Sequence, residues 1–336
     1  MEKRTIRLCL TVDVEEEGLF GGSYAREQVS VQNVEALQGL RSLAERNYPV
    51  TLFCDHAVFS DARACHFVEQ ARDHFGAEVG AHLHHWNTPP LVAAPEGAQG
   101  ERAVLVKNMN HALIRSKLEN LLVAAGRFQS EPVRAFRMGR WDIHSWMFRM
   151  LTEMGIETDA SVRPLHYGAE HPDHFDAPSQ PYRMIAGGKE LFEVPLTIAP
   201  LWKGLPRHAR LLDKAFAHYE GEFLHTVPLW GALGALPVYH CLPVMKLFAL
   251  HTLFWSGDTL VLAWHSSEMA AGATPHMPTA QHVERLMRRL HGFIDWLEQR
   301  YDVRPYTMTQ LHKECAAGSP LLQHNEFGSC PDWLAQ

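Results

Sequence analysis

Two groups of side chains, far apart in the sequence, could together hold a divalent cation and activate water. Asp13 and Glu15 follow an apolar run near the N-terminus and are one residue apart, so they would share a face of an extended strand. His82, His84 and His85 follow a second apolar run. Two neutral imidazoles and one carboxylate make an open coordination site for zinc, and a second carboxylate could take a proton from water. The pairing predicts a metal-dependent hydrolase.

Each group also has a simpler interpretation. Glu16 and Glu17 extend the acidic stretch, so Asp13 and Glu15 could belong to an exposed loop. The chain has 22 histidines, and some of them cluster by chance. The sequence alone leaves open which of His84 and His85 would accompany His82.

Two later segments carry candidate partners for these groups. Arg137 and Arg140 follow another apolar run, and a guanidinium beside a catalytic carboxylate would orient it and keep it ionised. A structural ion pair is the alternative for each arginine. His265 ends a further apolar run and could protonate a leaving group, with Glu268 or a neighbouring hydroxyl fixing its tautomer. A hydrogen-bonded structural histidine is the alternative there.

Strand-like and helix-like runs alternate along most of the chain. Such alternation predicts a parallel sheet wrapped by helices, and about seven such units predict an α/β barrel that is closed or nearly closed. In a barrel of this kind the catalytic groups lie at the carboxyl ends of the strands, where every candidate above falls. The predicted strands are 6–12, 49–54, 78–81, 133–138, 156–160, 191–196, 259–264 and 303–308, and the predicted helices are 34–44, 67–75, 108–125, 145–154 and 279–299.

The alternation stops between about residues 200 and 257, where helix formers and aromatic residues accumulate. We interpret this segment as a helical insertion in a barrel that spans residues 1–315, followed by a tail at 316–336. Residues 235–255 are apolar enough to resemble a membrane span. They also contain two prolines, two histidines and a lysine, which are costly in hydrocarbon, so a buried or interfacial helix is the better prediction.

Composition sets broad limits on function. The 336 residues are 46% hydrophobic and 21% charged, as in an ordinary globular protein. A net charge of −7 without a long basic run argues against nucleic acid as the main partner. The six cysteines lack CxxC spacing and indicate no disulfide framework, and the N-terminus has no signal-type apolar stretch. We therefore expect a cytoplasmic protein without a transmembrane span. The sequence does not indicate an oligomeric state.

The same segments, in this order, resemble the motifs of the polysaccharide deacetylase family, the NodB-homology or family-4 carbohydrate esterases. The stretch 11–15, Thr-Val-Asp-Val-Glu, is similar to the family motif Thr-Phe-Asp-Asp in its branch with one residue between the two acids. The stretch 78–82, Glu-Val-Gly-Ala-His, is similar to Glu-Ile-Gly-Asn-His. The usual second histidine is replaced by Trp86, so His84 or His85 must substitute for it, and a WalW-like subgroup favours His84.

The resemblance implies a distorted (β/α)7-8 barrel of the NodB-homology type and a role for each candidate. Asp13 would be the general base and Arg137 its brace, while His265 would be the general acid. The implied ligands of a divalent metal, most simply Zn²⁺, are Glu15, His82 and His84. Candidates for a sugar-binding wall are Trp86, Trp141 and Trp264.

The expected function is removal of acetyl groups from an N-acetylated or O-acetylated saccharide, in surface-polysaccharide metabolism. One alternative is a metal-dependent amidohydrolase that acts on a small non-sugar amide. Another is a catalytically inactive barrel that binds glycan. If the carbohydrate substrate is lipid-linked, the apolar segment 235–255 could provide peripheral membrane contact.

Overall fold

The computed structural model describes residues 2–94, 96, 98–167, 171–215, 222–255 and 257–322. Its main sheet has the strand order β10-β1-β2-β3-β4-β5-β7-β6-β12, and β11 also pairs with β1. The pairs are parallel except for β6 with β7. The strands are β1 Thr5–Val14, β2 Val50–Cys54, β3 Glu78–Leu83, β4 Ala135–Met138, β5 Thr158–Asp159, β6 Tyr182–Ala186, β7 Lys189–Glu193, β10 Thr259–His265, β11 Asp302–Tyr306 and β12 Leu321–Leu322.

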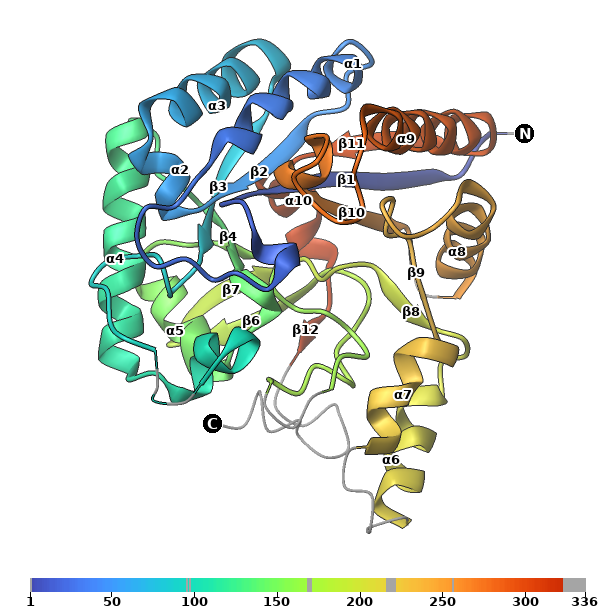
Figure 1. Cartoon of the computed structure of the whole chain (residues 1–336). Helices are drawn as coiled ribbons and strands as arrows, with labels where there is room; N and C mark the ends of the chain where they lie inside the picture. The colour runs from blue at the N-terminus through green and yellow to red at the C-terminus, as the bar shows by residue number, and fades with distance from the viewer. Residues whose placement is uncertain are drawn as a thin grey trace.

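The sheet curls into an open barrel with helices around its outer face (Figure 1). The surrounding helices are α1 Arg41–Ala44, α2 His56–Ser60, α3 Ala62–Phe75, α4 His111–Phe128, α5 Ser145–Glu153 and α9 Ala280–Arg300, whereas α10 Met308–Cys315 packs against the side chains inside the barrel. In the described part of the chain β10 does not pair with β7. Side-chain hydrogen bonds bridge that gap instead, because the Val261 amide donates to Thr197 Oγ1 at 2.7 Å and Gln180 bonds both backbone groups of Thr259. The predicted distorted α/β barrel is confirmed.

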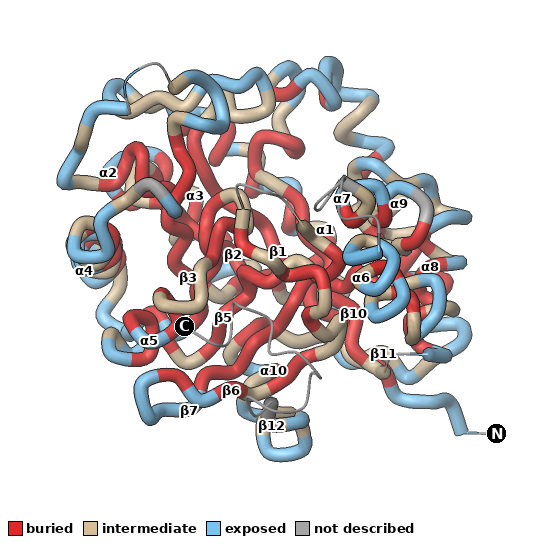
Figure 2. Tube along the Cα trace, turned by 90° about the horizontal axis from the view of Figure 1, so that it is seen from below, coloured by how far each residue is buried: buried red, intermediate tan, exposed pale blue. Residues whose placement is uncertain are grey.

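Residue alternation along the strands divides the core into two parts. Even-numbered residues of β1, such as Leu10 and Val12, pack outward against the helices in the larger hydrophobic cluster. Cys9 faces the barrel interior, where it joins Phe53, Val261 and the α10 residue Met308 in a smaller cluster. Figure 2 shows the strands buried at the centre of the molecule. Side chains fill the barrel interior lower down, and the inward-facing positions at the carboxyl ends of the strands remain to form a site.

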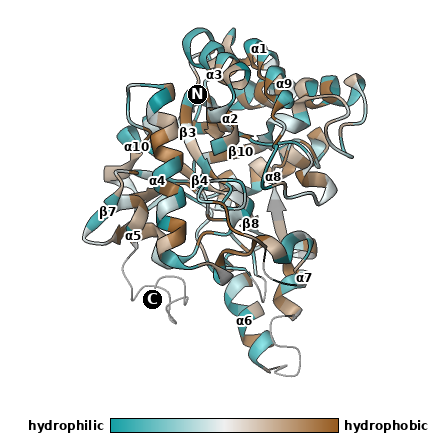
Figure 3. Ribbon diagram, turned by 60° about the vertical axis from the view of Figure 1, so that its left-hand side comes forward, coloured by the Kyte–Doolittle hydropathy of each residue, from teal (hydrophilic) through white to brown (hydrophobic). Residues whose placement is uncertain are grey.

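The segment after residue 197 departs from the barrel. Strands β8 Ile198–Pro200 and β9 Ala232–Gly234 form a small antiparallel sheet that connects the helices α6 Leu205–Ala215, α7 Glu222–Trp230 and α8 Leu242–Trp255. In Figure 1 α6 and α7 project away from the barrel, and in Figure 3 α6 is mostly hydrophilic and α7 mostly hydrophobic. Part of the segment predicted as one apolar helix is not helical, since α8 begins only at Leu242. No helix among the described residues has the length and apolar character needed to cross a membrane.

Several predicted boundaries differ from the structure. The predicted helix 34–44 is largely the 3₁₀ segment Gln32–Leu40, and α4 continues through Gly126 to Phe128. The antiparallel hairpin strand β6 was not predicted. The first part of the expected tail is ordered, because Leu321 and Leu322 pair with β6 at the edge of the sheet. The rest of that tail, from residue 323, lies outside the described residues.

Candidate metal and catalytic site

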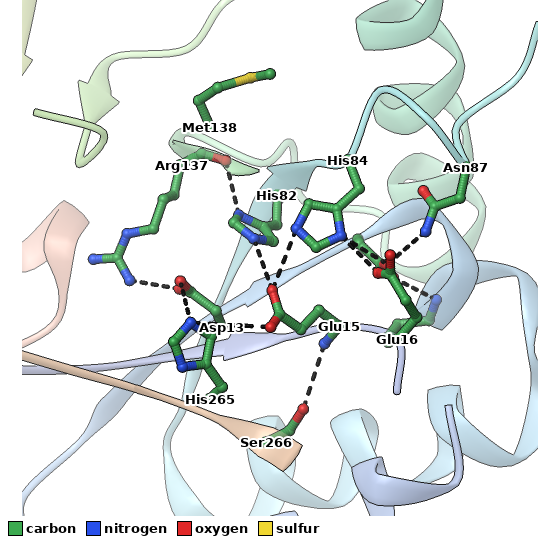
Figure 4. Close-up of polar contacts among 12 residues, drawn as sticks. Asp13, Glu15, Glu16, His82, His84, Asn87, Arg137, Met138, His265 and Ser266 are labelled. Atoms are coloured by element: carbon green, nitrogen blue, oxygen red, sulfur yellow. Dashed lines mark hydrogen bonds and ion pairs between the residues drawn. The ribbon is translucent and has the colours of Figure 1, made fainter. Parts of the chain in front are cut away.

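Strand register brings the predicted site residues to one edge of the barrel. Asp13 on β1 pairs with His265 on β10, and His82 on β3 pairs with Arg137 on β4. All four lie at the carboxyl ends of parallel strands, and Glu15 follows directly after β1 (Figure 4). Residues from distant parts of the sequence therefore converge on one place.

Glu15, His82 and His84 form a compact group of donor atoms. Oε2 of Glu15 lies 3.2 Å from Nε2 of His82 and 3.3 Å from Nε2 of His84, and the three donor atoms lie within 4.8 Å of one another. Nδ1 of His82 donates to the Arg137 carbonyl oxygen at 2.9 Å, which leaves Nε2 of that ring as the available lone pair. One carboxylate and two imidazole nitrogens, all buried, fit a divalent cation such as Zn²⁺ with a coordination position left for substrate or water.

The imidazoles around Glu15 determine the protonation state of its carboxyl group. Burial alone would raise the pKa of this carboxyl, but the imidazoles of His265, His82 and His84 offset that effect and hold the pKa below its usual range. The carboxylate is therefore ionised, which is the form that binds a cation.

The structure brings His84, and not His85, to Glu15. His85 points away, and its Nε2 donates to the Val104 carbonyl oxygen at 2.8 Å. Burial of this ring lowers the pKa of His85 to about 4, so it stays neutral in the core. The alternation of side chains along an extended segment accounts for the difference between the two neighbours.

Glu16 holds the His84 ring and was not predicted as a functional residue. Nδ1 of His84 donates to Glu16 Oε2 at 2.6 Å, and the indole Nε1 of Trp86 donates to Glu16 Oε1 at 2.7 Å. Burial and the Glu16 charge raise the pKa of Asp55 well above its usual range, so Asp55 carries a proton in its hydrogen bond with Glu16. This arrangement directs Nε2 of His84 toward Glu15. The sequence signal, a third acid after Asp13 and Glu15, was present but indistinguishable from an acidic loop.

Asp13 is fixed by Arg137. Nη1 of Arg137 lies 2.5 Å from Asp13 Oδ1 and also donates to Thr11 Oγ1 at 3.0 Å. The guanidinium lies between two aromatic rings, 4.2 Å from the Phe53 centroid and 4.7 Å from the Trp141 centroid. An arginine held on both faces by stacking and at its edge by hydrogen bonds has little freedom. It fixes the position of the Asp13 carboxylate.

His265 lies beside both carboxylates. Its Nδ1 donates to Glu268 Oε2 at 2.8 Å, as expected from the sequence, which directs Nε2 to 3.8 Å from Asp13 Oδ2 and 3.9 Å from Glu15 Oε1. Burial alone would lower the pKa of His265, but the carboxylates of Glu15, Glu268 and Asp13 raise it to about 10. The ring is therefore protonated near neutral pH and can donate from Nε2.

Comparison with protein-family models and with curated protein sequences gave no match. Among solved structures, a protein from Mycobacterium smegmatis assigned as a polysaccharide deacetylase is similar over 97% of this chain and 96% of its own, with a TM-score of 0.56 and 16% identity. This chain has the polysaccharide deacetylase fold. The 4-alpha-glucanotransferase from Thermococcus litoralis is similar over 96% of this chain and 42% of its own, with a TM-score of 0.53 and 11% identity. The same backbone arrangement therefore occurs with different chemistry.

The polysaccharide deacetylase fold of this chain has a cleft of about 600 Å³ above the site. Besides the polar groups, its lining includes several aromatic side chains, of which Phe20, Tyr24 and Tyr239 were not predicted from the sequence. Two of these come from the long loop after β1 and one from the turn before α8, where no sequence periodicity marks them.

The three predicted tryptophans have different surroundings. Trp141 lines the cleft and stacks on Arg137. Trp86 also borders the cleft but is only 1% exposed, stacked on His84 with ring centroids 4.2 Å apart, so most of its contacts are to the site residues. Trp264 is 1% exposed in the outer hydrophobic cluster and does not line the cleft. It is adjacent to His265 on β10, and alternation turns it toward the helices.

The turn after β4 has an unusual backbone. Arg140 and Trp141 both have φ near +60°, a region that non-glycine residues seldom adopt. Arg140 is held there by an ion pair with Glu101 at 2.7 Å and by a hydrogen bond to the Tyr24 hydroxyl. Strained backbone of this kind is found at ligand sites, and here it turns the Trp141 ring over Arg137.

Proposed function

We propose that the protein is a metal-dependent hydrolase that removes acetyl groups from an N-acetylated or O-acetylated saccharide. One observation carries the proposal: a carboxylate braced by arginine, a protonated histidine and a three-donor cation site all face one cleft. Hydrolysis of an acetyl group needs these three components, which are a base for water, an acid for the leaving group and a site for developing charge.

The residues of the chain divide the proton transfers between them. When bound, a divalent cation would polarise the acetyl carbonyl and lower the pKa of water in the cleft. Asp13, fixed by Arg137, accepts a proton from the attacking water. His265 gives its Nε2 proton to the departing group, which is an amine for an N-acetyl substrate and an alkoxide for an O-acetyl substrate. The products are acetate and the free amine or hydroxyl.

The lining of the cleft favours a saccharide over a small amide. Phe20, Tyr24, Trp141 and Tyr239 border it, and aromatic faces pack well against the apolar faces of sugar rings. The cleft is also large for a small cyclic amide. An inactive glycan-binding barrel is disfavoured because base, brace, acid and cation ligands are all retained together.

Acetate release from a panel of acetylated glycans and cyclic amides tests this proposal. The Asp13→Asn and His265→Ala variants should each lose about 10²-fold or more in kcat, the usual contribution of a positioned acid or base. Asp73→Asn and His74→Ala, both exposed on or beside the C-terminal turn of α3, are matched controls and should keep the wild-type rate. Wild-type rates in both site variants would overturn the assigned roles. Turnover of cyclic amides alone would replace the substrate class.

The cation requirement has a separate test. Purified protein should retain one equivalent of divalent metal by elemental analysis, and Glu15→Gln should retain much less because a charged donor is lost. Chelation should abolish acetate release, and added Zn²⁺ should restore it. Protein that neither retains nor responds to metal would support the inactive barrel instead.

A further inference from the structure

We propose that Arg163 binds an anionic group on the saccharide, so that the substrate of this site is an acidic or phosphorylated glycan. The inference rests on the proposed function and specifies its substrate class. It comes from a comparison of Arg140 and Arg163, which line the cleft, with Arg137, which is buried beneath it beside Asp13.

Two of these arginines pair with a carboxylate, whereas the third has no such partner in the part of the chain that the structure describes. Arg137 pairs with Asp13 at 2.5 Å, and Arg140 pairs with Glu101 at 2.7 Å. The guanidinium of Arg163 has neither an ion pair nor a hydrogen bond with any residue that the structure describes. It lines the same cleft as Asp13 and His265. One positive charge is therefore left facing the substrate space.

The environment of Arg163 makes this unpaired charge costly. Burial lowers the pKa of Arg163, Tyr239 opposes that effect, and no carboxylate among the described residues contributes to it. A partly desolvated cation without a counter-charge is unfavourable unless a ligand supplies the negative group. Arg163 nevertheless lines the cleft. This placement is typical of a residue that binds a ligand and not of one that forms a structural ion pair.

The backbone beneath Arg163 is held in place. The Val162 amide donates to Glu193 Oε1 at 3.1 Å, and the Val162 carbonyl accepts from the Leu196 amide at 3.0 Å. The Arg163 amide itself lies 3.4 Å from Nδ1 of the buried His174. A side chain presented from a fixed backbone loses less entropy on binding, so this arginine is preorganised for a ligand.

The chemistry of a guanidinium defines what it would bind. Its planar fork offers two parallel N–H donors, which match the oxygens of a carboxylate or a phosphate. In a saccharide these belong to a uronic acid or to a phosphate ester. Both share an anionic oxygen pair, and the experiment must separate them.

Steady-state kinetics on three matched oligosaccharides would test the inference. One is a neutral acetylated oligosaccharide, one carries a uronate next to the acetylated sugar, and one carries a phosphate ester there. Wild-type protein should show the lowest KM for one of the two charged substrates, which identifies the source of the charge. Arg163→Gln should raise that KM about tenfold with little change in kcat, the loss of one charge-assisted interaction. The KM for the neutral substrate should not change.

Two further variants make the result specific. Arg163→Lys keeps the positive charge but loses the planar pair of N–H donors, so its KM should lie between those of wild type and Arg163→Gln. The same variant tests the inference if Arg163→Gln fails to fold. Arg288→Gln, an exposed arginine on α9, is the matched control and should behave as wild type. Added salt should raise KM for the charged substrate in wild type much more than in Arg163→Gln.

Identical KM values for folded wild type and Arg163→Gln on every saccharide would overturn the inference. If wild-type protein releases no acetate from any of them, the proposed function fails. Calorimetric measurement of the binding of the same saccharides then tests the anion site independently. Selective loss of charged-saccharide binding in Arg163→Gln would then sustain the anion site, and equal binding would exclude it.

Discussion

The His84 ring lies directly over Gly139, so closely that a Cβ atom on Gly139 would be 2.3 Å from Cδ2 and 2.9 Å from Nε2 of His84. The same Cβ would lie 2.8 Å from the Leu83 carbonyl oxygen. These separations are far below van der Waals contact. Gly139 therefore leaves the space that lets His84 turn toward Glu15.

We predict that Gly139→Ala displaces the His84 ring and weakens cation binding about tenfold or more, with acetate release falling in parallel. Gly126→Ala is the matched control. Gly126 lies within α4, and a Cβ there meets nothing within 4 Å, so alanine should leave metal affinity unchanged. Competition titration with a chromophoric chelator measures the affinities. Equal affinities in the two variants would mean that His84 can bind metal from another position.

Glu16 provides a second prediction about the same ring. Glutamine at this position cannot accept from both His84 Nδ1 and Trp86 Nε1 as the carboxylate does. We expect Glu16→Gln to lower metal affinity about 10- to 100-fold, as is usual when the partner of a metal-binding histidine is altered. Glu131→Gln, on an exposed loop, should have no effect. Unchanged affinity in Glu16→Gln would show that ring packing alone orients His84.

The buried His174 predicts a pH dependence of stability. Burial lowers its pKa to about 4, and the neutral ring accepts at Nδ1 from the Arg163 amide while Nε2 donates to the Ile143 carbonyl oxygen. Between pH 6.5 and 4 the unfolded chain binds a proton at this residue and the folded chain does not. The free energy of unfolding should therefore fall as pH decreases through this window, by up to about 3 kcal/mol from this group.

Denaturant unfolding at several pH values between 7 and 4 would measure that effect. His174→Gln should be less stable at pH 7, but its stability should depend less steeply on pH, by about one proton. His74→Gln, an exposed histidine, should keep the wild-type slope. A slope that His174→Gln leaves unchanged would assign the acid sensitivity to other groups.

The outer surface of α8 predicts contact with a lipid surface. Several of its apolar side chains are exposed, with Leu247 at 59% and Phe254 at 76%, and the Trp255 ring lies against that of Phe254. Aromatic and leucine side chains on one surface are typical of helices that lie in a membrane interface. We expect part of the protein to sediment with anionic vesicles and the Leu247→Ser, Phe254→Ser double variant to sediment less. Val123→Ser removes a similarly exposed apolar residue on α4 and should not matter. Complete absence of wild type from the vesicle fraction would contradict this prediction.

The sequence predicted those features of the fold and the site that depend on local residue patterns. Alternating strand and helix signals gave the barrel, and acids or histidines at strand ends gave Asp13, Glu15, His82 and His265. Alternation also determines which of two adjacent strand residues faces the cleft, because neighbours on a strand point to opposite faces. Since His265 faces the cleft, Trp264 must face the helices, as the structure shows.

The rest of the site depends on contacts that sequence spacing does not encode. Glu16 and Asp55 interact only because β1 and β2 are neighbours in the sheet. Tyr239 reaches the cleft from the insertion, and the absence of a charged partner for Arg163 among the described residues is a property of three-dimensional packing. The WalW-like subgroup, the identity of the metal and a cytoplasmic location stay predictions.

The pairing of β1 joins segments that are far apart in the sequence. Strand β1 lies against β10 on one side and partly against β11 on the other. A fragment cut before residue 259 would leave these edges of β1 unpaired and would lack His265 beside Asp13. Such truncation should therefore produce an aggregation-prone fragment and not a smaller folded barrel.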